Sequence, residues 1–233
     1  MTIRFALSTF IAPLLLAAAP PTPKSAAADP PDDIYVAIET TAGTILVDLE
    51  ETRAPLSTAN FLKYVDAERL DGTAFYRSMH LDWGTPPNGL IQGGIAANPE
   101  LTFEPVAHEP TSETGVLHKR GTISLARYAP GTATADFSIM VSDMPGLDAQ
   151  PESDDAEARA GFAAFGHVVE GMDVVMAIWN MPRSATKGEG ALKGQMIENP
   201  VKILTVRRAE PPVADAVPDA VENVTDPEAT AAD

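Results

Sequence analysis

The side chains that most often carry enzyme chemistry are scarce in this chain of 233 residues. It has no cysteine, which excludes disulfides, thiolate catalysis and cysteine-ligated zinc. No pair of its histidines has a short metal-ligand spacing; they are His80, His108, His118 and His167. The acids of residues 152–157 do not follow EF-hand spacing, and we interpret them as a charged, solvated loop. We therefore expect no metal and no cofactor.

Motifs for nucleotide binding and hydrolysis are also missing. The chain has no G-x-G-x-x-G, no P-loop, no G-x-S-x-G and no H-E-x-x-H. Its net charge is -17, from 16 basic and 33 acidic residues. Nucleic acids and anionic membranes bind basic surfaces, so we expect neither as a partner. Hydrophobic residues make up 45% of the chain, which is enough for a globular core.

Both ends differ in composition from the centre. Residues 1–28 read as an export signal, with Arg4, an apolar run over 5–19 and small residues before position 28. A buried N-terminal helix is the alternative. Residues 210–233 hold seven acids, four prolines and no Lys or Arg, which predicts a disordered acidic tail. We expect a signal peptide over 1–28, a folded domain over 29–209 and a tail over 210–233, in a protein exported to the bacterial periplasm.

Hydrophobic periodicity divides the central part into short strands and two helices. Residues 34–41 and 44–50 alternate as an opening β-hairpin. Helices are predicted over 55–67, with proline in the first turn, and over 172–180, before Pro182. The remaining predicted strands are 74–78, 90–92, 122–126, 138–141, 164–169 and 201–207. Many short strands with two helices predict an all-β barrel or sandwich.

Four blocks in a fixed order are more specific than this pattern. They are Phe75-Tyr76-Arg77, Ile91-Gln92-Gly93-Gly94, GTISLAR at 121–127 and FGHVVEGMDVV at 165–175. Together they resemble the cyclophilins, the cyclophilin-type peptidyl-prolyl cis-trans isomerases, over roughly residues 33–208. The resemblance implies a closed eight-stranded antiparallel barrel, packed inside and capped by two α-helices, with substrate bound in a groove on its outer surface.

The resemblance also implies a reaction, rotation about X-Pro bonds in proline-containing polypeptides. Amide resonance opposes this rotation with a barrier of about 18–20 kcal/mol. In the twisted state the prolyl nitrogen regains its lone pair, so a donor aimed at it stabilises the transition state. Arginine is always protonated and carries several donors. By position in the family motif, Arg77 is the catalytic arginine, and Gln92 contacts both it and the substrate.

Other positions carried over from the family line the groove. Ala126 and Arg127 occupy the strand end that contacts the substrate backbone, and Phe162 stands where many members place His or Tyr against the proline. The substrate-binding set is Phe75, Leu90, Ala126, Arg127, Asp136, Phe137, Ser138 and Phe162. The residues alone leave alternatives: a surface arginine paired to an acid for Arg77, and plain barrel core for the phenylalanines 137, 162 and 165.

The chain departs from the family pattern at three groove positions. The phenylalanine ahead of the glutamine is Gly89 here, and Trp83 or Leu81 could replace it. Ser138 stands for the phenylalanine that floors the proline pocket, which removes about 1.5–3 kcal/mol of apolar contact. Asp136 stands for an amide; it cannot donate a hydrogen bond, and it could pair with an arginine of the groove.

Three functions follow from these observations. The first is an active isomerase for exported proteins, favoured by the presence of Arg77 and Gln92. The second is a binding module or chaperone for proline-containing segments with little turnover, favoured by Gly89 and Ser138. The third, without the resemblance, is an exported barrel with a small apolar ligand inside. We predict the isomerase, as a monomer with no membrane partner after signal cleavage.

Overall fold

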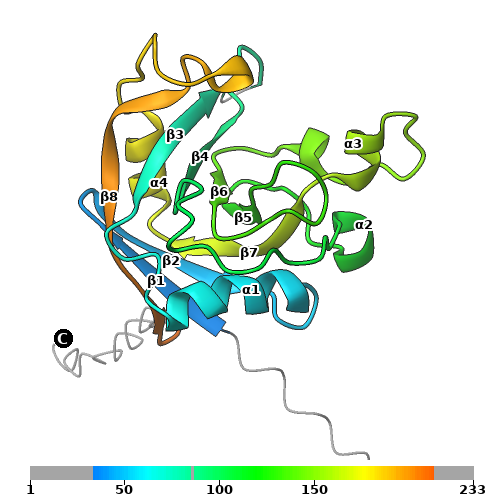
Figure 1. Cartoon of the computed structure of the whole chain (residues 1–233), viewed down its shortest axis with the longest axis horizontal. Coiled ribbons are helices and arrows are strands. Elements are labelled where there is room, and N and C mark those ends of the chain that lie inside the picture. Colours follow the sequence, from blue (N-terminus) through cyan, green and yellow to red (C-terminus); the bar gives the residue numbers. More distant parts are fainter. Residues whose placement is uncertain (1–33, 85–86, 213–233) are drawn as a thin grey trace, which may run out of the picture. The chain divides into compact units, whose positions relative to one another are not determined.

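The computed structural model describes residues 34–84 and 87–212. The predicted signal peptide and residues 213–233 of the predicted tail lie outside the described residues. Eight antiparallel strands close into a barrel in the order β1-β2-β7-β5-β6-β4-β3-β8 (Figure 1). They are β1 (Ile34–Thr40), β2 (Gly43–Leu49), β3 (Ala74–His80), β4 (Gly89–Gly94), β5 (Thr122–Leu125), β6 (Phe137–Met140), β7 (Ala163–Glu170) and β8 (Met196–Ala209). The predicted fold class is confirmed.

Aromatic side chains fill the interior of the barrel. The rings of Phe61 and Phe137 meet edge to face at 5.4 Å, and those of Phe75 and Phe137 at 5.6 Å. Phe165 lies 5.3 Å from Phe61. All four rings are at most 1% exposed, and buried Ile and Val side chains from the strands surround them. This dense packing argues against the alternative of a small apolar ligand inside the barrel.

Helix α1 (Pro55–Asp66) packs where β2 ends, next to β7. Its N-cap residue, Ala54, supplies no side-chain hydrogen bond. A distant acid caps it instead: the Glu109 carboxylate accepts from Leu56 N at 3.1 Å and from Ser57 N at 2.9 Å. The buried Glu109 thereby satisfies two backbone donors that the first helical turn leaves free.

Helix α4 (Met172–Trp179) packs at the other end of β2, where a Cβ on Gly43 would meet Val174. Trp179 ties this helix to β3. Its indole Nε1 donates to Met79 O at 2.9 Å, and its carbonyl accepts from Ser78 Oγ at 2.7 Å. The His80 ring also stacks on the indole at 3.8 Å. Helix α4 therefore holds the strand that carries Arg77.

Both predicted helices are present, but the structure adds short elements that we did not predict. They are α2 (Thr111–Thr114), α3 (Ala156–Ala160) and the 3-10 turns η1 (Pro145–Leu147) and η2 (Gly190–Leu192). Helix α3 begins inside the acidic run interpreted as a solvated loop, because Asp155 caps it by accepting from Glu157 N and Ala158 N. Across the described ranges, no helix has the length and apolar character needed to cross a membrane.

Candidate active site

A β-bulge in β3 brings two neighbouring polar side chains to the outside of the barrel. The register between β3 and β4 shifts between Phe75 and Arg77. Phe75 and Ser78 are fully buried, whereas Tyr76 and Arg77 both hydrogen-bond Gln92 of β4. A bulge of this kind places an extra residue in one strand and redirects its side chains.

Arg77 heads a polar row that crosses four strands. Cross-strand pairing places Arg77 opposite Gln92, Gln92 opposite Ser138, and Ser138 opposite Ser124. An apolar row runs beside it, from Met79 through Leu90 to Met140. This second row belongs to an apolar cluster, separate from the barrel core, that also includes Met144, Leu81 and Leu147. The outer face therefore combines hydrogen-bond donors with a neighbouring apolar surface.

Three neutral acceptors hold the Arg77 guanidinium. Nη1 donates to Gln92 Oε1 at 2.6 Å, Nε donates to Gln195 Oε1 at 2.8 Å, and Nη2 contacts Met79 Sδ at 3.5 Å. Among the described residues no carboxylate lies within ion-pair distance of it, so the alternative of an acid-paired surface arginine has no support. Burial lowers the pKa of Arg77, yet a guanidinium stays protonated throughout the physiological range.

Asp136 forms an ion pair with neither Arg77 nor Arg127, the two arginines among the predicted groove residues. Its carboxylate accepts from the backbone N–H groups of Ala96, at 2.9 Å, and Ala97, at 3.3 Å. Burial raises the pKa of Asp136, and these two backbone donors oppose the rise. Arg127 instead donates to Glu157 at 2.8 Å and to Gly161 O at 2.6 Å.

The remaining predicted groove residues lie in different places. Phe75 and Phe137 lie fully inside the barrel, so they support the outer face from beneath. On the outer face lie Leu90 and Ser138, both largely buried by their neighbours. Phe162 is half-buried beneath the Arg127 guanidinium, whose carbon is 4.6 Å from the ring centre.

Ala126 and Arg127 follow β5. Ala126 is half-buried, and its backbone N–H donates to Asp136 O at 2.8 Å. The Arg127 side chain is only 2% exposed, so its guanidinium stabilises the surrounding loops and offers little surface to a substrate.

Gly89 has no room for the family's phenylalanine. A Cβ there would lie 2.3 Å from Met79 O and 2.6 Å from Trp179 Nε1. Of the two residues considered as replacements, Leu81 packs on the outer apolar cluster, whereas Trp83 is 58% exposed. The cluster, with Leu81 in it, therefore provides apolar surface next to the arginine.

Two partners of Arg77 were missed at the level of sequence. Gln195 is 118 residues away along the chain, in the loop before β8, and no local motif marks it. Met79 lies two residues after Arg77 on the same face, a position that ordinary strand alternation does indicate.

A Ser-His-Asp chain also lies at the end of the polar row. His118 Nδ1 is 2.7 Å from Asp148 Oδ1, and His118 Nε2 is 2.9 Å from Ser124 Oγ. Ser124 is 2% exposed and His118 is 1% exposed, so no substrate reaches the hydroxyl. Asp148 also accepts from the backbone N–H of His118 at 2.9 Å. These contacts tie two long loops to β5, and we assign them a structural role.

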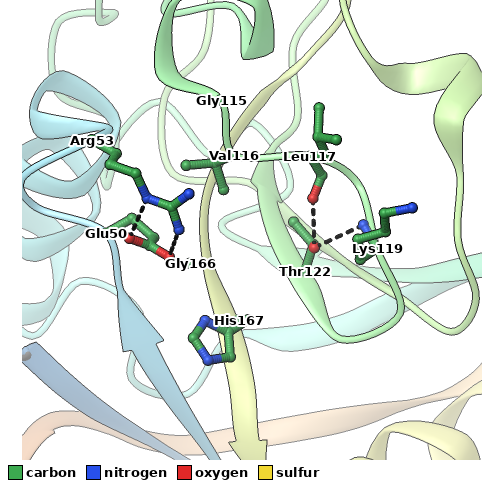
Figure 2. A pocket seen from close by; sticks show the side chains of 9 residues that line it. All are labelled: Glu50, Arg53, Gly115, Val116, Leu117, Lys119, Thr122, Gly166 and His167. Carbon is green, nitrogen blue, oxygen red and sulfur yellow. Dashed lines mark hydrogen bonds and ion pairs between the residues drawn. The ribbon is translucent and has the colours of Figure 1, made fainter.

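A surface hollow of about 360 Å³ lies beside β2, β5 and β7. Figure 2 shows the residues that line it. None of the candidate site residues lines it. Its cations already have partners: Arg53 pairs with Glu50, and Lys119 Nζ donates to Asp143 at 3.0 Å. The Thr122 hydroxyl is also used, because it donates to Leu117 O at 2.9 Å. Within the parts of the chain that the structure describes, no three His, Asp or Glu side chains form a metal-binding group.

Comparisons with known proteins show which family the chain resembles. The family model for cyclophilin-type peptidyl-prolyl cis-trans isomerases matches residues 35–208. A peptidyl-prolyl cis-trans isomerase of Acinetobacter baylyi is 35% identical over 176 residues, which cover 74% of this chain and 84% of that protein. Isomerase B of Escherichia coli is 34% identical over 145 residues, covering 60% and 80%. A crystal structure of a Cryptosporidium parvum cyclophilin-type isomerase superposes with a TM-score of 0.57 at 18% identity, covering 77% of this chain and 99% of that one.

Proposed function

Because this chain belongs to the cyclophilin-type peptidyl-prolyl cis-trans isomerase family and is an enzyme of that class, we propose that Arg77 is the group that drives the rotation. The observation that carries this proposal is the neutral setting of its guanidinium on the outer face. Arginine has five N–H donors, and three of them are directed at Gln92, Gln195 and Met79. The other two donors have no partner among residues 34–84 and 87–212, and we propose that they are available to a substrate.

The chemical step follows from what the twisted amide gains. In the planar ground states the prolyl nitrogen shares its lone pair with the carbonyl and accepts hydrogen bonds poorly. At the top of the barrier the lone pair is localised, so an Arg77 N–H binds the nitrogen more strongly there than in either planar state. A half-buried guanidinium acts in a lower dielectric than water, which strengthens this difference. The step needs no proton transfer.

The proline ring needs an apolar surface beside this donor. The partly buried side chains of the outer apolar cluster, Met79, Leu81 and Leu147, provide one, with the buried Leu90 and Met140 beneath them. Methionine side chains adapt to irregular shapes, so this cluster can accept the ring although Ser138 replaces the family's aromatic floor. Ser138 supports the alternative function, a module that binds proline-containing segments with little turnover.

The substrates we propose are X-Pro bonds in exported proteins of the bacterial periplasm. The composition of residues 1–28 supports this location, with its positive charge, apolar run and small residues. Fractionation of cells that express the chain with and without these residues tests the location directly. Cytoplasmic retention of the full chain would contradict it.

Exchange NMR on a short Ala-Pro peptide tests the mechanism without a coupling protease. Uncatalysed exchange takes tens of seconds or longer, so even modest acceleration is measurable. We expect acceleration by the full chain and its loss in Arg77→Ala. Arg53→Ala is the matched control, because that arginine is exposed and pairs with Glu50 instead of Gln92. A folded wild-type protein without acceleration would favour the binding module.

The pH dependence gives a second test. Arginine does not titrate between roughly pH 5 and 9, so we expect no bell-shaped activity profile in that interval. A clear bell centred near neutrality would count against the arginine mechanism.

A further inference from the structure

A chain of polar side chains leads to Arg77 from a carboxylate that makes no ion pair with it. Its anchor is Asp136, whose oxygens accept from Ala96 N at 2.9 Å and Ala97 N at 3.3 Å. Both alanines have positive φ angles, 50° and 56°. That conformation is unfavourable for residues other than glycine, and here it turns two consecutive N–H groups toward one anion.

The next links run through Tyr76 and Gln92. The Tyr76 hydroxyl lies near the Asp136 carboxylate, whose charge adds to burial in raising the pKa of the tyrosine. Gln92 Nε2 donates to the same hydroxyl oxygen at 2.8 Å. Gln92 Oε1 then accepts from Arg77 Nη1 at 2.6 Å.

Each bond of this chain has only one direction. The guanidinium of Arg77 can only donate, so Gln92 must turn its oxygen toward the arginine and its NH₂ toward Tyr76. The hydroxyl of Tyr76 accepts from that NH₂, which leaves its own proton to be donated to the neighbouring Asp136 carboxylate. The carboxylate of Asp136, when ionised, can only accept. An amide at position 136 would remove this constraint, because it could either donate or accept.

We propose that the Tyr76 hydroxyl donates to the Asp136 carboxylate, and that both are positioning residues, which fix the orientation of the Gln92 amide and through it the guanidinium of Arg77. This inference rests on the proposed function. It replaces the expectation that Asp136 contacts the substrate. The bulge that places Tyr76 and Arg77 on the same face is what allows the chain to form.

The test uses two conservative variants and their combination. Tyr76→Phe removes one oxygen, and Asp136→Asn replaces the obligate acceptor by an amide. Each variant interrupts the same chain of hydrogen bonds to Arg77. We therefore expect each to lower kcat roughly five- to twentyfold, which is the effect of losing one hydrogen bond, with KM little changed. The double variant should lose no more than the larger single loss, since the second change finds the chain already broken.

Asp143→Asn is the matched control. Asp143 also accepts from a backbone N–H, Arg120 N at 2.9 Å, and from a side chain, Lys119 Nζ at 3.0 Å, but it has no connection to Arg77. We expect its activity to equal that of the wild type. A second readout is the NMR signal of the Gln92 side-chain amide, which should shift in Tyr76→Phe and Asp136→Asn and stay unchanged in the control.

Each outcome decides. Folded single variants with activity within twofold of wild type would overturn the proposal, as would independent losses that multiply in the double variant. A loss confined to KM would instead make Asp136 a substrate contact. If Asp136→Asn fails to fold, Tyr76→Phe alone decides by the same criteria. Wild type and Arg77→Ala are measured in the same series, so failure of the proposed function appears separately, as a wild type without activity or an active Arg77→Ala.

Discussion

Gly89 is the position where the family pattern and this structure disagree most sharply, and its substitution gives a measurable test. Restoring a larger residue at a departure from the family would ordinarily be expected to help. Here a Cβ at Gly89 would lie 2.3 Å from Met79 O and 2.6 Å from Trp179 Nε1. Real Cβ atoms do not come that close to backbone oxygens, so β3 or the indole must move.

The expected cost of Gly89→Ala follows from three contributions. Overpacking at a dense site costs about 1–3 kcal/mol. Displacing the indole also breaks its hydrogen bond to Met79 O, which is worth about 0.5–1.5 kcal/mol. Alanine also lowers the conformational entropy of the unfolded chain, which stabilises the folded protein by about 0.4–1 kcal/mol. We therefore expect a net loss of about 2 kcal/mol in the free energy of unfolding.

Urea unfolding of wild type and variant measures this loss. Gly146→Ala is the control, because a Cβ there would meet nothing within 4 Å and the φ of Gly146 is not positive; we expect it to change stability by less than about 0.5 kcal/mol. Gly89→Phe, with the family's own residue, should be less stable still and no more active. A Gly89→Phe protein with wild-type stability and faster turnover would refute the assignment of the pocket to the outer apolar cluster.

Three further variants test the parts that support the site. Glu109→Ala should lower the free energy of unfolding by about 1–2 kcal/mol in urea, because the first turn of α1 loses its cap; an unchanged midpoint would contradict this. Phe137→Leu should cost about 2–3 kcal/mol through two lost ring contacts, while kcat/KM of the folded protein stays unchanged; a selective loss of activity would show that the ring reaches the substrate. Burial lowers the pKa of His118 more than Asp148 raises it. As the pH falls, the imidazole is therefore protonated in the unfolded chain before it is protonated in the folded protein. Stability should therefore fall as pH drops below about 6.5, and a His118→Asn variant with the same pH slope would refute this source.

The strands were predictable because short apolar runs lie between clear turn signals, and because buried residues alternate with more exposed ones in β1 and β8. Strand β8 shows the limit of that signal. It starts at Met196 instead of the predicted position 201, because the exposed run through Asn199 and Pro200 interrupts the alternation. Helix α3 was missed because Asp155 lies in an acidic run and cannot be told from a solvated acid by sequence. In the structure its carboxylate caps the helix by accepting from the backbone N–H groups of Glu157 and Ala158.

The candidate site was predictable only in part. Family motifs indicated Arg77 and Gln92, and the structure brings these two side chains together. Gln195 could not be found, since pairing between distant strands places it beside the arginine. The bulge after Phe75 could not be found either, although it decides which side chains of β3 face outward.

The Arg77 guanidinium is held by neutral acceptors and by no carboxylate among the described residues, and its proposed role explains this arrangement. The chain carries a net charge of -17, so a carboxylate beside the guanidinium would be easy to provide. An ion pair would orient the arginine, but it would also neutralise the positive charge that strengthens the hydrogen bond to the prolyl nitrogen of the twisted amide. Glutamine oxygens orient it without that loss. The one acid in the proposed chain of hydrogen bonds, Asp136, is held by two backbone N–H groups and is separated from the arginine by Tyr76 and Gln92. Because Asp136 does not contact the guanidinium, it can fix the direction of the hydrogen bonds between them without neutralising the positive charge that binds the substrate.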